Sequence, residues 1–127
     1  MAIHKSGEDY LEAILKLQKQ HGQVRSIDVV DELHYSKPSV SVAMKKLRET
    51  GYVLMDENGL LTLTPTGNAI ASRIYERHQV LTAILVALGV EEHEAAEEAC
   101  QLEHDMSDST FQKIKEHYEE HKRKHLR

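Results

Sequence analysis

The chain has 127 residues, 40% of them hydrophobic and 29% charged, which fits one compact domain or a small domain with an appended dimerisation unit. The sequence holds no apolar run of about 18 residues, so we expect no membrane span, and residues 1–6 lack the apolar stretch of a secretory signal. Cys100 is the only cysteine, which excludes an internal disulfide framework and favours a cytoplasmic location.

The net charge of −5 argues at first against a nucleic-acid partner, but the charge is unevenly distributed. Residues 37–50 hold four basic side chains and one acid, a local balance of +3. Residues 91–108 hold eight acids and neither lysine nor arginine. We therefore predict two tasks in one chain, a basic segment that attracts phosphate and an acidic segment that attracts cations.

The first predicted helix begins at Ser6, as an N-cap with Asp9 three residues later, and runs to about Gln20. A second helix is predicted over residues 26–33. Apolar spacing predicts one buried face on each helix. These faces consist of Leu11, Ile14, Leu15 and Gln18 in the first helix, and of Ile27, Val30 and Leu33 in the second.

The third predicted helix starts after the N-cap Ser36, carries Pro38 in its first turn, and stops before Gly51. Two short apolar runs, residues 52–55 and 60–63, flank an Asn-Gly pair and predict a β-hairpin. The elements to this point have the order of a winged helix-turn-helix.

Three more helices are predicted, over about residues 64–88, 91–104 and 108–124. The sequence therefore predicts a mainly α fold of two domains. Residues 1–66 form the winged helix-turn-helix, and residues 67–127 form a helical domain.

The third helix is the predicted DNA-reading element, because such a helix projects small or polar side chains into the major groove while neighbours hold phosphates. Val40, Met44 and Leu47 are predicted to pack inward. The alternative is that the cap residues only start the helix and the lysines form a solvated face. The predicted DNA contacts are Ser36, Lys37, Ser39, Ser41, Val42, Lys45 and Lys46, with Asn58 at the hairpin tip.

The acidic segment carries Cys100, Glu103 and His104 at positions i, i+3 and i+4, which share one face of a helix. Glu97 lies one turn earlier on the same stripe. Thiolate, carboxylate and imidazole together suit a divalent transition metal. Further candidate ligands from other helices are His78, Asp9 and Glu12.

Each candidate ligand also has a plain structural explanation. Asp9 completes a capping box, Glu12 pairs with Lys16, His78 is interfacial, and Cys100 is a small buried apolar residue. A second set with i+4 spacing is interpreted as mostly solvent-exposed, and consists of His117, His121 and His125.

Five segments together resemble the DtxR/MntR family of iron- and manganese-dependent repressors, in its short, two-domain form. Glu8-Asp9-Tyr10-Leu11-Glu12 looks like the family's first-helix motif, and residues 36–41 look like the start of its recognition helix. Residues 63–67 look like the exit of its wing. Residues 77–78 and 98–104 look like its metal-binding helices.

The resemblance implies that the metal ligands are Asp9, Glu12, His78, Cys100, Glu103 and His104. Manganese-type members carry an acid and a glutamate at the positions of Asp9 and Cys100, and iron-type members carry methionine and cysteine. The thiolate favours Fe(II) and would accept Zn(II) or Co(II) in vitro, whereas Asp9 and Glu12 favour Mn(II). The predicted cofactor is therefore Mn(II) or Fe(II). The ancillary positions of the iron-type site correspond to Thr82 and Ala96, neither of them a good ligand.

The function implied is a repressor of Mn(II) or Fe(II) uptake genes that binds palindromic operator DNA as a homodimer through its C-terminal helices. We expect a bound cation to tie the first helix to the helices of His78 and Cys100, which sets the two recognition helices roughly 34 Å apart or a multiple of it. The predicted dimer stripe, with intramolecular core as the alternative, consists of Leu81, Ile84, Leu85 and Leu88.

Three other classes of protein compete with this interpretation. A winged-helix regulator of the MarR kind would sense an organic ligand, and it leaves the candidate metal ligands without a role. An enzyme with Cys100 as nucleophile and His104 as base lacks an evident third orienting group, so we predict no enzyme. A metal buffer leaves the basic helix unexplained.

Overall fold

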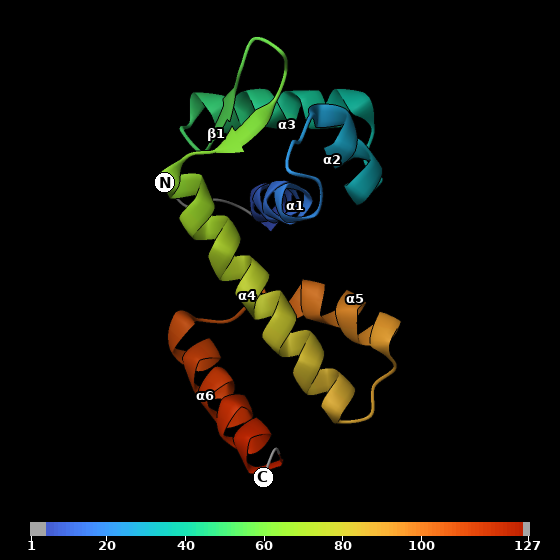
Figure 1. Cartoon of the computed structure of the whole chain (residues 1–127), viewed down its shortest axis with the longest axis vertical. Coiled ribbons are helices and arrows are strands. Elements are labelled where there is room, and N and C mark those ends of the chain that lie inside the picture. The colour runs from blue at the N-terminus through green and yellow to red at the C-terminus, as the bar shows by residue number, and fades with distance from the viewer. Residues whose placement is uncertain (1–4, 126–127) are drawn as a thin grey trace. The chain divides into compact units, whose positions relative to one another are not determined.

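The computed structural model describes residues 5–125, without the side chains of residues 123–125. Residues 1–4, which belong to the segment examined for a secretory signal, lie outside the described residues. The predicted mainly helical fold is confirmed (Figure 1). Its elements are α1 (Lys5–His21), α2 (Ser26–Leu33), α3 (Lys37–Glu49), β1 (Val53–Met55), β2 (Leu61–Leu63), α4 (Pro65–Ala87), α5 (Glu92–Leu102) and α6 (Asp108–His125).

The chain forms two compact units, one up to Tyr75 and one from Glu76 onward, and α4 continues from the first into the second. The predicted domain boundary after residue 66 stays a prediction. Among the helices in the described part of the chain, none combines the length and apolar character needed to cross a bilayer.

The core of the first unit is built on α1, whose Leu11 and Ile14 are fully buried. The predicted N-cap at Ser6 is wrong, because α1 already includes Lys5 and Ser6. Asp9 therefore lies inside the helix and does not cap its start. This removes the capping explanation of Asp9.

The bounds of α2 agree with the prediction, but its buried face does not. Val29 is fully buried, whereas Ile27, predicted to be buried, is 44% exposed. Val30 and Leu33 are partly buried and pack against the core. Ile27 and Val29 lie at the two edges of the apolar arc of this eight-residue helix, so spacing alone did not identify which edge faces α1 and α3.

α3 begins as predicted, with the Ser36 hydroxyl accepting a hydrogen bond from the Ser39 amide at 3.2 Å and Pro38 in the first turn. Its inward face is buried in the predicted way, through Val40, Met44 and Leu47.

The hairpin also forms where it is predicted, with Val53 opposite Leu63 and Met55 opposite Leu61. Its turn contains Gly59 at a φ of 80°, a conformation that favours glycine. The Leu61 amide attaches this wing to the segment before α2 by donating to the Val24 carbonyl at 2.7 Å. The Thr64 amide closes the base of the hairpin by donating to the Tyr52 carbonyl at 3.1 Å. A Cβ atom at Gly67 would lie 2.0 Å from that same carbonyl oxygen, so only glycine permits this approach.

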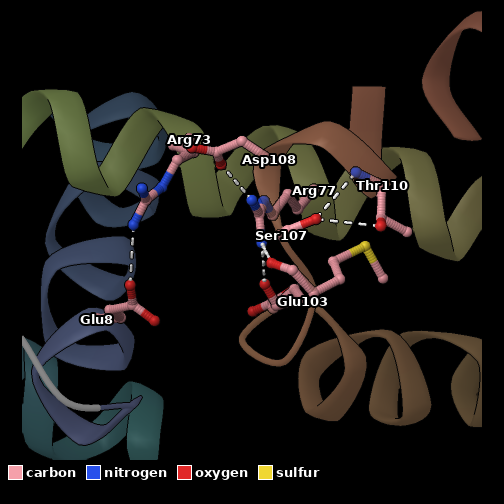
Figure 2. Close-up of polar contacts among 8 residues, drawn as sticks. Glu8, Arg73, Arg77, Glu103, Ser107, Asp108 and Thr110 are labelled. Carbon is pink, nitrogen blue, oxygen red and sulfur yellow. Dashed lines mark hydrogen bonds and ion pairs between the residues drawn. The ribbon is translucent and has the colours of Figure 1, made fainter. Parts of the chain in front are cut away.

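Helix α4 is also joined to α1. Arg73 of α4 donates a hydrogen bond to Glu8 of α1 at 3.1 Å, as Figure 2 shows.

The second unit contains the later part of α4 together with α5 and α6. Gly89, at a φ of 104°, follows α4, and Glu91 is the N-cap of α5. Hydrogen bonds from the backbone amides of Glu94 and His93 lower the pKa of the Glu91 carboxyl. The buried apolar residues here are Leu81, Ala95, Ala99 and Phe111.

Candidate metal centre and nucleic-acid interface

The centre of the candidate site is Glu103, whose side chain is 0% exposed. One carboxylate oxygen lies 2.9 Å from Nδ1 of His78, and the other lies 3.4 Å from Nε2 of His104. That second oxygen makes no hydrogen bond within the described residues. Because a buried carboxylate needs compensating charge or full hydrogen bonding, the arrangement fits a bound cation.

Cys100 and His104 complete the donor set of the second unit. A ligand atom from each of Cys100, Glu103 and His104 lies within 4.8 Å of the other two. The His104 side chain is 2% exposed and that of His78 is 31% exposed. Sulfur, oxygen and nitrogen donors at this spacing suit a divalent transition metal, and the residues present therefore fit the metal that the sequence predicts.

The local backbone differs from the prediction that these ligands share one helical face. α5 ends at Leu102, and Glu103 is its C-cap, so His104 lies in the turn that follows. The buried Arg77 binds the carbonyl groups of Glu103 and Met106, which stand at the two ends of this turn. Sequence reasoning missed this role of Arg77. The only signal was its position directly before His78.

The structure also separates Glu97 from the cluster. Its side chain is 67% exposed and lies 3.0 Å from Nε2 of His93 one turn earlier on α5. The prediction that Glu97 belongs to the ligand stripe is therefore wrong.

In the first unit, Asp9 and Glu12 lie three residues apart on α1, and both are partly buried. Lys16, the partner that the alternative explanation gives to Glu12, pairs with Glu32 of α2 at 2.7 Å. Burial, with the neighbouring Tyr35 and Asp9, raises the pKa of the Tyr10 phenol, which keeps that group neutral on the adjacent face of α1.

The predicted DNA-reading face of α3 is exposed. Val42 is 67% exposed although it is apolar, and both lysines of the central turn are exposed. A single exposed valine is ordinary on a protein surface, and here it lies among serines and lysines on the predicted reading face. All predicted DNA contacts are exposed, namely Ser36, Lys37, Ser39, Ser41, Val42, Lys45, Lys46 and Asn58.

The predicted dimer stripe divides in the structure. Leu81 is 5% exposed and belongs to the core of the second unit, whereas Leu88 is 77% exposed. Ile84 and Leu85 are partly buried.

The histidines of α6 lie outside the candidate site. His117 and His121 are exposed, and their rings stack with centroids 6.5 Å apart. The side chain of His125 lies outside the described residues.

Comparisons with known proteins match both halves of the chain. Residues 3–65 match the family description "Iron dependent repressor, N-terminal DNA binding domain". Residues 64–125 match "Iron dependent repressor, metal binding and dimerisation domain". The chain belongs to the iron-dependent repressor family. Its members are metal-dependent transcriptional regulators and not enzymes, and the MarR alternative is not supported.

Individual relatives agree with this assignment. The chain is 34% identical to an uncharacterized HTH-type transcriptional regulator of Methanocaldococcus jannaschii, over 89% of this chain and 92% of that protein. It is also 34% identical to the transcriptional regulator MntR of Salmonella typhimurium, over 82% of this chain and 66% of that protein.

A solved structure described as a manganese-dependent transcriptional repressor in complex with manganese is similar with a TM-score of 0.79 and 32% identity. The similarity covers 88% of this chain and 52% of that one, so the chain spans about half the length of this solved relative.

Proposed function

We propose that this protein is a cytoplasmic repressor that binds palindromic operator DNA as a homodimer when Mn(II) or Fe(II) occupies its metal site, and that it controls uptake of these metals. The observation that carries the proposal is the buried Glu103 carboxylate between His78 and His104, within reach of the Cys100 thiol. The exposed basic face of α3 in the same chain supports the DNA partner.

The proposed ligand set joins residues of both units. His78, Cys100, Glu103 and His104 come from the second unit, and Asp9 and Glu12 come from α1 of the first. A bound divalent cation supplies the positive charge that compensates these carboxylates. Without it, the three acids among these ligands repel one another.

This arrangement explains how metal occupancy would reach the DNA. α1 packs against α3 in the core of the first unit, so holding α1 also holds the reading helix. In a homodimer, the two α3 helices must lie roughly 34 Å apart, or a multiple of it, to enter successive major grooves. The metal then binds the DNA-binding state of the protein more tightly than the other state. By the same linkage, bound DNA increases the affinity for the metal.

The proposed DNA contacts on α3 divide by chemistry. Lys37, Lys45 and Lys46 provide charge for phosphates, whereas the serines and Val42 face base edges and thymine methyl groups. Asn58 at the wing tip meets the backbone or the minor groove.

The proposed dimer surface lies toward the end of α4. Ile84, Leu85 and the exposed Leu88 would be covered by the partner subunit, with Leu81 supporting them from the core. Covering an exposed leucine and its half-buried neighbours is favourable at roughly 25 cal/mol per Å².

The test is a metal-by-metal DNA-binding titration under anaerobic conditions, with a DNA fragment selected from a random pool in the presence of Mn(II). We expect Mn(II) or Fe(II) to raise DNA affinity by at least about tenfold and a chelator to reverse the effect, which corresponds to a coupling free energy in the usual range. Equal affinity with and without every metal would overturn the proposal.

A further inference from the structure

We propose that Arg77 is a positioning residue, which holds the turn carrying Glu103 and His104 in its ligating geometry before any metal binds. Arg77 is 4% exposed, and no described contact connects it with a ligating atom of the cluster. It would therefore set metal affinity without touching the ion. The inference rests on the proposed function, because it concerns the same cluster.

The first part of the argument is the pair of carbonyl groups bound by one nitrogen of Arg77. Its Nη1 donates to the carbonyl of Glu103 at 3.0 Å and to the carbonyl of Met106 at 2.8 Å. These carbonyls stand at the two ends of the turn that contains His104. Because the two N–H bonds of a planar nitrogen diverge at a fixed angle, they fix the separation of the two ends.

The guanidinium is itself held in place. Nη2 pairs with Asp108 in the first turn of α6 (Figure 2). Cζ lies 5.3 Å from the centroid of the Phe111 ring. The Asp108 side chain is 74% exposed, so this ion pair is screened by solvent and contributes little alone. The role of Asp108 is therefore to orient the guanidinium, while the buried contact with Glu103 and the partly buried contact with Met106 hold the turn.

Both flanks of the turn are fixed as well. The Glu103 amide donates to the Ala99 carbonyl at 2.9 Å, which continues the α5 pattern to the C-cap. On the other side, the Thr110 amide donates to the Ser107 hydroxyl at 3.1 Å at the start of α6, as Figure 2 shows. With Arg77 bound between them, the Glu103 backbone has its amide and its carbonyl both engaged, and the contact of its carboxylate with His78 at 2.9 Å orients the side chain.

Losing such outer contacts typically costs tenfold to a hundredfold in metal affinity. We expect the Arg77→Lys variant to show that loss, because an ammonium is a shorter point donor and does not reach two carbonyls and a carboxylate together. Lys115→Ala is the matched control. Lys115 also joins α4 to α6, through Glu76 at 3.0 Å, and this hydrogen bond raises the Lys115 pKa, but no described hydrogen bond or ion pair connects either residue with the turn.

The experiment measures Mn(II) and Co(II) affinity by anaerobic calorimetry on the full chain, with the thiolate-to-cobalt charge-transfer band as a signature of Cys100 ligation. Hydrogen exchange of the backbone amides of residues 104–107 is measured in the metal-free protein. We expect Arg77→Lys to bind both metals at least about tenfold more weakly and to exchange these amides faster, with helicity retained. Lys115→Ala should match the wild type in both measurements.

Wild-type affinity and slow exchange in a folded Arg77→Lys variant would overturn the inference, as would equal losses in the two variants. If Arg77→Lys does not fold, Asp108→Asn decides. It keeps both carbonyl contacts but loosens the guanidinium, so we expect a smaller loss of affinity, and unchanged affinity would overturn the inference. If the wild type itself binds neither metal, the proposed function fails, and the exchange measurement still reports whether Arg77 holds the turn.

Discussion

The Glu103→Gln variant should lose the stabilisation that metal gives to the folded protein while keeping the stability of the metal-free protein. Glutamine has nearly the same volume and can keep a hydrogen bond to His78, so it leaves no cavity in this buried position. It removes the negative charge that the cation needs. Alanine would instead leave a void and confuse the two effects.

The size of the effect follows from linkage and chain length. Metal at about 100 times its dissociation constant adds about 2.7 kcal/mol of stability. For 127 residues, each kcal/mol moves Tm by about 4 °C, so the wild type should gain about 10 °C. A variant that binds about 100-fold more weakly gains only about 0.4 kcal/mol, or roughly 2 °C, at the same metal concentration.

The assay is anaerobic thermal unfolding with and without Mn(II), followed by circular dichroism. Glu97→Gln is the matched control, because it makes the same substitution on an exposed α5 residue outside the cluster. It should keep the full shift of about 10 °C. A shift of that size in Glu103→Gln would refute the assignment of Glu103 as a ligand.

Three further predictions concern selectivity, DNA binding and the wing. Cys100→Glu should change metal-stimulated DNA binding in favour of Mn(II) over Fe(II), because a hard carboxylate replaces a soft thiolate; equal responses before and after the change would contradict this. Lys46→Ala should weaken DNA binding and reduce the slope of log affinity against log salt concentration by about one. The control Lys16→Ala on α1 should leave this slope unchanged. An unaltered slope in Lys46→Ala would mean that Lys46 contacts no phosphate. Gly67→Ala should lower Tm measurably, since its Cβ would lie 2.0 Å from the Tyr52 carbonyl oxygen, and an unchanged Tm would show that the wing tolerates a shift.

The parts of the fold that the sequence predicted well have local causes. The bounds of α2, the Ser36 cap with Pro38, and the hairpin around Gly59 depend on propensities and turn chemistry within a few residues. The start of α1 was missed because a cap residue and an interior residue can have the same sequence context, and Ser6 proved to be interior.

The parts that were missed depend on contacts between segments distant in sequence. The buried side of α2 depends on what α1 and α3 present to it, and this favoured Val29 over Ile27. The turn after α5 is contacted by Arg77, which lies 26 residues before Glu103. Such a contact cannot be read from the spacing of the ligands alone, although Cys100, Glu103 and His104 lie at the end of this helix and in the turn that follows it.

The central claim is that metal and operator DNA bind the same state of the protein, and the linkage between them tests it most directly. The dissociation constant for Mn(II) should be measured anaerobically with and without saturating operator DNA, alongside the dissociation constant for DNA with and without Mn(II). We predict that each ligand tightens the other by the same factor of at least about ten. Identical Mn(II) affinity in the presence and absence of DNA would contradict the account.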